Sequence, residues 1–481
     1  MNLVDALFWQ ARKQPQVPAI IERDQTISYC ELGDRVLRTA AHLAKLGIVR
    51  GDKVALCLND DSQNIIAFWA IACLGAAAVP IDARSRPAER SRIVEAFPLR
   101  LALVTPESER GVTCPKVILD AAWHSAVAAA DQISAPAGDW HAPLATLGSS
   151  GTTGLPKFTI ATHFEYHFHT ISYLEVVPPG RHRYLSALPL YFAAGRLACV
   201  AHLLRGDTLI FHPALASPEE FVGNILHHKI TASFVGPSTM RQLLSMSAGG
   251  DRPVLPEIDL LISGGAPLFA DERLDILAKV TPRFCEMYGT AAMGATTALR
   301  GEEIRERPAS VGRPFAYIDA EIVDDNDRPV GHGIPGHLRC RGPGLTTPVT
   351  FGSDAPSRDF RDGWYYSGEV AAVDELGYVF LQGRTSEVIF RRGYKVYPTE
   401  IEAVLQEHEG VAEAVVIGRS LPNNEQEPVA YVVAKKHVTA GELLGHCRTK
   451  LTPFKVPREI HIVASFPRNP SGKVDKRALA G

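Results

Sequence analysis

The first 250 residues alternate between segments that favour helices and segments that favour buried strands. Residues 31–47 carry apolar side chains at helical spacing and end at Gly47, a residue type that often terminates a helix. Apolar runs at 53–58 and 77–81 predict strands, and residues 64–76 between them predict a helix. Strands joined through helices at this spacing predict a parallel sheet with helices on its faces. The expected fold class is therefore α/β.

The character of the sequence changes twice after this region. Between residues 310 and 383, short strand-like runs alternate with Gly, Asp and Pro turns, which is typical of an antiparallel barrel or sandwich. The segments that follow predict a small α+β unit with a basic, lysine-bearing tail. We therefore expect a large N-terminal domain over residues 1–383, which includes a small β-barrel at about 310–383, and a C-terminal domain over residues 384–481.

Composition excludes several classes of protein. Apolar residues make up 46% and charged residues 21% of the 481-residue chain, as in globular proteins. The formal net charge of −3 provides no basic field for nucleic acid. Eight cysteines without a Cys-x-x-Cys pair fit a reducing compartment, and no apolar run approaches the roughly 18 residues that span a bilayer. We expect a cytoplasmic protein without a nucleic-acid or membrane partner.

Residues 148–158, GSSGTTGLPKF, have the composition of an anion-binding loop. The glycines let backbone amides converge, the hydroxyls can donate hydrogen bonds, and the lysine adds a positive charge. The spacing differs from GxxxxGK[ST], which excludes a P-loop nucleoside triphosphatase. A surface linker of the same composition remains the alternative. The groups expected to bind phosphate are Ser149, Ser150, Gly151, Thr152, Thr153, Gly154 and Lys157.

Further segments follow this loop in a fixed order. They are SGGAPL at 263–268, MYGTAAMG at 287–294, a long run at 363–402 and FPRNPSGKVDKRAL at 466–479. Together with the loop, they resemble the AMP-forming adenylating enzymes, which include acyl-CoA synthetases, adenylation domains of non-ribosomal peptide synthesis and firefly luciferase. The resemblance covers essentially the whole chain. It implies that the C-terminal domain is a mobile lid with a hinge near Ser386.

The resemblance also implies the reaction. In these enzymes a carboxylate attacks the α-phosphate of ATP, pyrophosphate leaves, and an acyl adenylate forms. The thiol of coenzyme A, or of the pantetheine on an acyl carrier protein, then displaces AMP. Negative charge accumulates on the phosphate in the first step, so the protein has to supply preorganised cations and hydrogen-bond donors.

Individual residues match the nucleotide contacts of these enzymes. Gly264, Gly265 and Ala266 match the segment along the adenine edge, and Tyr288 matches the aromatic side chain that stacks on the base. The usual ribose-binding aspartate is replaced by a glutamate, which is longer but still an acceptor. The remaining expected nucleotide contacts are Gly289, Thr290, Glu369 and Arg384.

Two lysines are the expected catalytic residues. Lys473, in NPSGK, matches the lid lysine that bridges carboxylate and phosphate during adenylation, and Lys157 closes the phosphate loop. The substrate is expected to be a small carboxylic acid. Its identity does not follow from the sequence, but Tyr191, Phe192 and Phe234 would suit an aromatic or medium-chain apolar group. The residues expected to line its pocket are Tyr191, Phe192, Phe234 and Gly265.

The chain departs from the family pattern at several functional positions. Ala291 stands where a threonine would bond the α-phosphate, and Ala292 stands where a glutamate would hold magnesium. Phe390 replaces a lysine tied to thioester formation, Phe192 replaces a histidine at the mouth of the acyl pocket, and Phe158 replaces a glycine. Loss of one transition-state donor costs roughly 10²–10³ in rate, so these departures bear directly on catalysis.

No metal ligand is expected among the side chains. His163, His167 and His169 have a spacing that zinc sites use, but no acidic third ligand with a motif lies nearby. Magnesium is still expected to accompany ATP, held by phosphate oxygens and water, although its usual glutamate is Ala292.

Two functions follow from these matches and departures. The first is an ATP-dependent acyl or aryl ligase that transfers the acyl group to coenzyme A or a carrier-protein pantetheine. The second is a catalytically impaired protein of the same fold that serves as the binding partner of an acyl carrier protein. Phe390, flanked by Arg391, Arg392 and Lys395, would suit docking against an acidic carrier protein. An ordinary solvated face is the alternative for this basic cluster.

Overall fold

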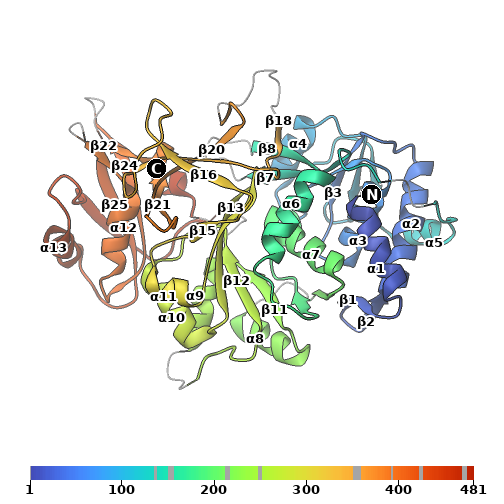
Figure 1. Ribbon diagram of the computed structural model, residues 1–481, viewed down its shortest axis with the longest axis horizontal. Helices are drawn as coiled ribbons and strands as arrows, with labels where there is room; N and C mark the ends of the chain where they lie inside the picture. Colours follow the sequence, from blue (N-terminus) through green and yellow to red (C-terminus); the bar gives the residue numbers. More distant parts are fainter. Residues whose placement is uncertain are drawn as a thin grey trace.

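The computed structural model describes residues 2–134, 138–149, 157–211, 217–247, 252–349, 359–391, 394–421, 426–468 and 474–480. At residues 149, 157, 347–349, 477 and 480 it describes the backbone alone. Figure 1 shows an elongated molecule, with the N-terminal sheets and helices at one end and the C-terminal part at the other.

A largely parallel sheet lies at the centre of the N-terminal part (Figure 1). In spatial order its strands are β15 (Arg313–Pro314), β14 (Gly294–Arg300), β13 (Phe284–Thr290), β12 (Leu260–Gly264), β11 (Ala232–Val235), β9 (Arg183–Leu185), β10 (Thr208–Phe211), β1 (Pro18–Glu22) and β2 (Gln25–Ser28). Neighbouring strands run parallel from β13 to β1, and the outer strands are antiparallel to their neighbours.

A second sheet lies beside the first. In spatial order its strands are β18 (Thr347–Val349), β8 (Lys157–Thr162), β7 (Pro143–Ser149), β4 (Ala77–Pro80), β3 (Lys53–Cys57), β5 (Leu101–Val104) and β6 (Lys116–Ile118). The strands from β7 to β6 are parallel, whereas β8 and β18 run antiparallel to their neighbours. The carboxyl ends of the parallel strands therefore share one edge of the sheet.

Helices cover both sheets. They are α1 (Leu3–Lys13), α2 (Tyr29–Lys45), α3 (Ser62–Cys73), α4 (Pro87–Ala96), α5 (Ala121–Ala128), α6 (His163–Leu174), α7 (Ala193–Arg205), α8 (Pro218–His227), α9 (Pro237–Met246), α10 (Ala270–Asp275), a π-helix η1 (Ile276–Val280) and α11 (Glu302–Glu306). Reciprocal capping boxes start α2 at Ser28 with Glu31 and α6 at Thr162 with Glu165, so both starts follow from local sequence.

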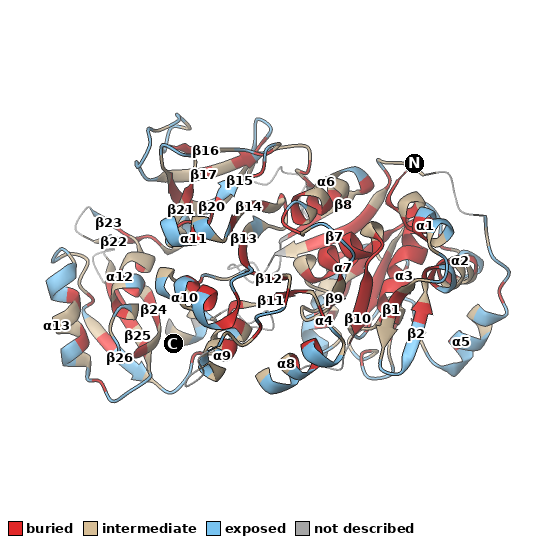
Figure 2. Cartoon of the chain, turned by 60° about the horizontal axis from the view of Figure 1, so that its bottom comes forward, coloured by how far each residue is buried: buried red, intermediate tan, exposed pale blue. Residues whose placement is uncertain are grey.

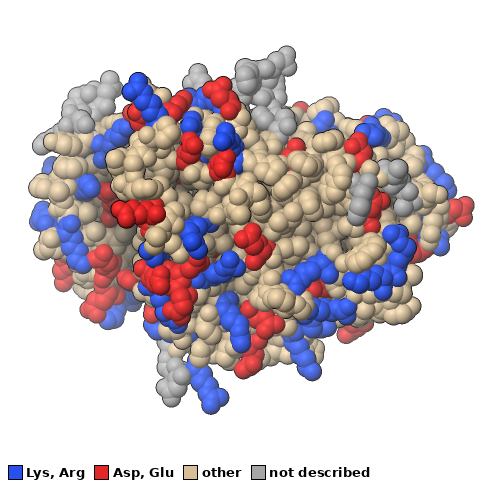
Figure 3. Space-filling model, viewed as in Figure 1, with Lys and Arg blue, Asp and Glu red and all other residues tan. Residues whose placement is uncertain are grey.

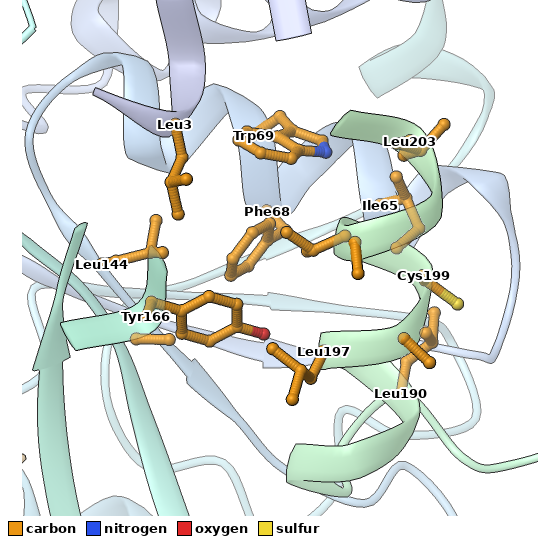
Figure 4. Packing of buried hydrophobic residues seen from close by; sticks show 14 of the residues in the cluster. Leu3, Ile65, Phe68, Trp69, Leu144, Tyr166, Leu190, Leu197, Cys199 and Leu203 are labelled. Atoms are coloured by element: carbon orange, nitrogen blue, oxygen red, sulfur yellow. The ribbon is translucent and has the colours of Figure 1, made fainter. Parts of the chain in front are cut away.

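The main hydrophobic core joins the two sheets through α3 and α7, which are almost entirely buried (Figure 2). Their burial on all sides explains why these helices are apolar around most of their circumference. At the centre of the core, Phe68 of α3 packs near Tyr166 of α6, and Leu197 of α7 lies beside them (Figure 4).

An antiparallel third sheet and a small C-terminal part complete the fold. The third sheet contains β16 (Asp319–Val323), β17 (Gly336–Arg341), β19 (Phe360–Arg361), β20 (Trp364–Val373) and β21 (Val379–Arg384). The C-terminal part contains a 3₁₀ turn η2 (Thr385–Glu387), β22 (Ile389–Arg391), β23 (Tyr394–Val396), α12 (Pro398–Gln406), β24 (Val411–Ser420), β25 (Gln426–Ala434), α13 (Ala440–Lys450), β26 (Glu459–Val463) and α14 (Lys476–Ala480). It has a hydrophobic cluster of its own.

The expected fold class is confirmed, with parallel α/β layers, a small antiparallel β part and a C-terminal α+β part. A domain boundary between residues 383 and 384 stays a prediction, and β21 runs across it. Positive and negative side chains are interspersed over the face shown in Figure 3. None of the described helices combines the length and apolar character that crossing a membrane requires.

Candidate active site

The expected phosphate loop connects β7 to β8. Ser149 ends β7 and Lys157 begins β8, and the two residues are paired across the antiparallel hairpin. Because β7 runs parallel to β4, the loop leaves the carboxyl edge of the sheet, where open α/β sheets bind their ligands. The expected residues that fall outside the described part of the chain are Ser150, Gly151, Thr152, Thr153, Gly154 and Lys473.

Phe158 anchors the return strand of this hairpin. Its side chain is buried, and its ring lies 4.9 Å from that of Phe97 in a T-shaped arrangement. A Cβ atom added to Gly148 would lie only 2.9 Å from the Phe158 ring, so glycine gives the ring its space. The phenylalanine that replaces the usual glycine therefore packs into the core below the loop.

Gly264 and Gly265 occupy a backbone segment that has little tolerance for side chains. A Cβ atom on Gly264 would lie 2.4 Å from the carbonyl oxygen of Met287 on the adjacent strand. Gly265 has a φ angle of +86°, in the left-handed region that favours glycine, and it is exposed. The half-buried Ala266 follows. This arrangement leaves an accessible backbone surface at the end of β12, as the adenine-edge assignment requires.

Tyr288 lies beside this segment, because it comes directly after Met287, which pairs with Gly264 in the parallel β12–β13 ladder. The Tyr288 hydroxyl is buried and has no hydrogen-bond partner among the described residues. Burial raises the pKa of this phenol, and the carboxylate of Glu369 adds to the effect. The structure thus brings the expected adenine and ribose contacts close together.

The β13–β14 turn carries the departures from the family pattern. Gly289 has no room for a Cβ atom, which would lie 2.2 Å from the carbonyl oxygen of Gly294. The Thr290 hydroxyl accepts a hydrogen bond from the Met293 amide at 3.2 Å, so it closes the turn. This bond fixes the Thr290 hydroxyl in the turn, one residue before the position where Ala291 replaces the threonine.

Ala292 is buried and offers no ligand atom to a metal from its side chain. Its carbonyl oxygen accepts hydrogen bonds from the amide and the hydroxyl of Thr346, at 2.9 and 3.1 Å. In the described part of the chain, no group of three or more His, Cys, Asp or Glu residues could hold a metal ion. The alanine at position 292 therefore cannot hold a magnesium ion through its side chain.

Glu369 and Arg384 form an ion pair across β20 and β21. They are direct partners in the antiparallel ladder, and Oε1 of Glu369 lies 3.4 Å from Nε of Arg384. Gly368, with a φ angle of +75°, precedes the glutamate, and the Ser367 hydroxyl accepts a hydrogen bond from the Glu369 amide. A carboxylate held in this way is suited to accept hydrogen bonds from vicinal hydroxyl groups.

Some of the residues expected to line the acyl pocket lie near one another, and their role stays a prediction. The ring of Phe192 faces Gly265, where a Cβ atom would be 3.6 Å away, and Phe234 lies 3.4 Å from the corresponding point on Gly264. The Phe234 ring stacks on Tyr173 of α6, with centroids 6.4 Å apart. Tyr191 instead lies under the guanidinium of Arg84, 5.8 Å from the ring centroid, and its place in the pocket stays a prediction.

The three histidines of α6 have separate surroundings. His163 is buried with no partner for either ring nitrogen in the described part of the chain, whereas His167 packs against Trp140. Nε2 of His169 lies 2.8 Å from the carbonyl oxygen of Gly344. Burial lowers the pKa of His163 and of His169 to about 4. These rings are neutral core side chains at physiological pH.

Sequence analysis did not identify two buried polar residues on the helices that carry the expected pocket. Arg196 of α7 and Tyr166 of α6 are both almost fully buried. The available signal was a single arginine inside the otherwise apolar run AAGRLACVAHLL.

Comparison with known proteins identifies the family. Residues 7–348 match the AMP-binding enzyme family, and residues 400–473 match the AMP-binding enzyme C-terminal domain. The chain belongs to this family. The resemblance to the AMP-forming adenylating enzymes is thereby confirmed.

The relatives of this family member include acid–CoA ligases. A 2-succinylbenzoate–CoA ligase of Bacillus licheniformis is 28% identical over 99% of this chain and 100% of its own length. The Bacillus subtilis o-succinylbenzoate coenzyme A synthetase, solved in complex with ATP and magnesium ion, is 26% identical with a TM-score of 0.87 over 99% of each chain. ATP-bound MatB of Rhodopseudomonas palustris shares the fold, at 24% identity and a TM-score of 0.90 over 100% of this chain and 98% of its own.

Proposed function

We propose that this protein is an ATP-dependent acid–thiol ligase that forms an acyl adenylate and transfers its acyl group to the thiol of coenzyme A. The observation that carries the proposal is that Gly264 and Gly265 at the end of β12, Tyr288 on the adjacent strand β13, and the Glu369–Arg384 pair of the third sheet lie close together, since the charge of Glu369 acts on Tyr288. The acid–CoA ligase names of the full-length relatives support the same reaction.

In the first step, a carboxylate oxygen of the acid bonds to the α-phosphorus of ATP. The bond from that phosphorus to the bridging oxygen breaks, and pyrophosphate leaves with the electron pair. Lys157 and Lys473 are proposed to stabilise the charge that develops on the phosphate, and the amides of the phosphate loop are proposed to donate hydrogen bonds to it. Magnesium enters with ATP as part of the substrate complex, and no step is assigned to a protein-bound ion.

The Glu369–Arg384 pair is proposed to hold the ribose. In this arrangement the carboxylate accepts hydrogen bonds from the ribose hydroxyls, and the guanidinium keeps it ionised and oriented. Tyr288 is proposed to stack on adenine above the backbone of Gly264 and Gly265. In the second step, a thiol attacks the acyl carbonyl carbon, and AMP leaves with the bonding electrons.

The acid is proposed to occupy the aromatic pocket of Phe192 and Phe234. Pyrophosphate exchange against a panel of aromatic and medium-chain acids, with and without magnesium, tests the ligase proposal. Exchange that depends on one class of acid supports it. Absence of exchange with every acid, together with no binding of ATP or AMP at millimolar concentration, contradicts it.

A second candidate is the impaired protein that binds an acyl carrier protein. Ala291, Ala292 and Phe390 favour this candidate because all three departures fall on positions assigned to chemistry. The Phe390 side chain is 53% exposed, but Arg391 donates to the carbonyl oxygens of Phe454 and Val456. Arg391 is therefore held against the C-terminal part, and Arg392 lies outside the described residues.

Interferometry against acyl carrier proteins and coenzyme A, at low and high salt, separates the candidates. Tighter binding of a carrier protein than of free coenzyme A would support the second candidate. Saturable binding of coenzyme A without a carrier-protein signal at either salt concentration would support the plain acyl-CoA ligase.

A further inference from the structure

Arg196 is a charged side chain in the middle of the hydrophobic core. It is 2% exposed, and Nη2 donates a hydrogen bond to Oδ1 of Asn64 on α3 at 2.9 Å. Its Nε and Nη1 atoms are buried and have no hydrogen-bond partner in the described part of the chain. The guanidinium lies 4.9 Å from the ring centroid of Phe68, which provides a cation–π contact. A buried charge with unpaired donors is costly, so its presence calls for a reason.

Arg196 forms no ion pair with the acidic residues that the structure describes. Asp60 is the acidic residue whose field acts on it, but one oxygen of Asp60 accepts the Leu190 amide at 2.6 Å and the other lies 3.6 Å from Arg84. Burial lowers the pKa of Arg196 to about 10, so the side chain still carries its proton at neutral pH. The Tyr166 hydroxyl beside it is also buried, and it too has no partner among the described residues.

Helices α6 and α7 connect the residues of the expected acyl pocket with Tyr166 and Arg196. The amide of Arg196 donates to the carbonyl oxygen of Phe192 at 3.1 Å, so the two residues lie one helical turn apart at the start of α7. Phe234 stacks on Tyr173, which lies on α6 together with Tyr166. We call the region between Tyr173 and Arg196 the α6–α7 seam, and Figure 4 shows how Tyr166 reaches across it toward α7.

The two ends of this seam differ in how well their polar groups are satisfied. At the Tyr173 end, the Tyr173 hydroxyl lies 3.1 Å from Nε2 of His202, and Nδ1 of His202 lies 2.7 Å from Asp207. At the Arg196 end, Nε and Nη1 of Arg196 and the Tyr166 hydroxyl have no hydrogen-bond partner among the described residues. These donors require an acceptor, and the positive charge of Arg196 favours an anionic one.

We infer that Arg196, assisted by Tyr166, binds a second carboxylate at the distal end of the acid, so that the preferred substrates are dicarboxylic acids. The inference rests on the proposed ligase function, because it assigns the acid that this site activates. A substrate carboxylate would supply both the counter-charge and the acceptor that the seam lacks. Side chains that cover Arg196 have to move to admit the acid, because Nε and Nη1 of Arg196 have no contact with solvent.

Matched pairs of acids test this inference. Glutarate, adipate and pimelate are compared with pentanoate, hexanoate and heptanoate in pyrophosphate exchange, and in calorimetric titrations in the presence of ATP. Removal of one partner of a buried ion pair typically changes affinity on the order of 10²–10³-fold. We expect the wild-type protein to prefer the best diacid over its matched monoacid by that factor. Arg196→Met should abolish the preference, and Arg196→Lys should retain part of it.

Control variants separate recognition from folding. Arg205→Met changes another arginine of α7, whose Nη2 donates to the Pro178 carbonyl at 2.6 Å, and it should leave the diacid preference unchanged. Without ligand, Arg196→Met should melt at the same temperature as wild type or higher, because methionine removes an unpaired buried charge. A diacid should raise the melting temperature of wild type but not of Arg196→Met.

The outcomes distinguish this inference from the ligase proposal. Exchange with monoacids and no preference for a second carboxylate would overturn the inference and leave the ligase proposal standing. Equal losses for diacids and monoacids in Arg196→Met, or a marked fall in its melting temperature, would also overturn it, since both indicate a structural arginine. Binding of a diacid that depends on Arg196, without any exchange, would support the inference and contradict the ligase proposal. Absence of exchange with every diacid and monoacid, together with no binding of any diacid and no binding of ATP or AMP, would overturn both.

Discussion

Glu369 on β20 lies directly opposite Arg384 on β21, and Oε1 of the glutamate is 3.4 Å from Nε of the arginine. Arg384 is also the last residue of β21, directly before the 3₁₀ turn at Thr385–Glu387. The expected hinge at Ser386 therefore begins at the proposed ribose contact. Any rotation about this turn would start from a residue that contacts the nucleotide, so nucleotide binding and lid position would be coupled in the proposed ligase.

The first prediction concerns this pair. Glu369→Ala should raise the KM for ATP by about tenfold to a hundredfold, since hydrogen bonds to a charged group contribute roughly 1.5–3 kcal/mol. Glu369→Asp, which keeps the acceptor, should lose much less. Pyrophosphate exchange as a function of ATP concentration provides the measurement. Glu321→Ala is a matched control because Glu321 forms an ion pair with Arg339, at 2.7 Å, within the same sheet. Equal effects of the two alanine variants would contradict a nucleotide role for Glu369.

A second prediction concerns the departures at Ala291 and Ala292. Replacing them together by threonine and glutamate should raise pyrophosphate exchange at least about tenfold, because one transition-state donor contributes roughly 10²–10³ in rate. The dependence on magnesium should also become steeper, since the glutamate adds a ligand. Ala292 is 2% exposed, so the single Ala291→Thr variant should be measured beside the double one. If neither variant alters the rate, the slow step or the function lies elsewhere.

Sequence periodicity was sufficient for the layers of this fold but not for their assembly. Alternating apolar runs predicted parallel strands, because local spacing reports whether a segment is buried on one face or on both. The pairing of β1 with β10, and of β18 with β8, joins residues far apart in the chain and has no local signature. Strand order therefore had to come from the structure.

The candidate site was also predictable only in part. Motifs assigned Gly264, Tyr288 and Glu369 to the nucleotide, and these roles stay predictions. The structure adds that Gly264 has no room for a side chain and that the charge of Glu369 acts on Tyr288. Motifs could not report that Thr290 closes a turn or that Arg391 is held by backbone carbonyls, since both depend on neighbours distant in sequence. The apolar run around Arg196 was the one sequence signal of its burial. It was not sufficient, because arginine in a helix is usually exposed and its burial depends on the elements packed against it.

A third prediction follows from the buried histidines. The pKa of both His163 and His169 is lowered from 6.5 to about 4, chiefly by burial. Between these pH values the unfolded state binds protons that the folded state does not. The stabilising contribution of each neutral histidine should therefore be complete above pH 6.5 and be lost as the pH is lowered toward 4. This loss should lower the free energy of unfolding by roughly 3 kcal/mol for each histidine.

Thermal melts from pH 7.5 to pH 4.5 check this dependence. His163→Leu should flatten the profile, because it removes one of the two groups and leaves no unpaired ring nitrogen. His124→Leu changes an exposed histidine and should keep the wild-type slope. A His163→Leu profile as steep as that of wild type would show that the acid sensitivity has another source.

The last prediction concerns Phe390 on β22. The resemblance to the adenylating enzymes places a lysine there that assists thioester formation, and the Phe390 side chain is 53% exposed. Substitution at an exposed position usually changes stability by less than about 0.5 kcal/mol, so Phe390→Lys should fold normally. If the protein is a coenzyme A ligase, this variant should transfer the acyl group from the adenylate to coenzyme A faster, with pyrophosphate exchange unchanged.

Leu376→Lys is the control, because the Leu376 side chain is 59% exposed on the turn between β20 and β21, and this variant should alter neither step. Single-turnover assays that start from the enzyme-bound adenylate isolate the transfer step. A transfer rate that stays at the wild-type level, combined with weaker carrier-protein binding, would instead identify Phe390 as part of a docking surface.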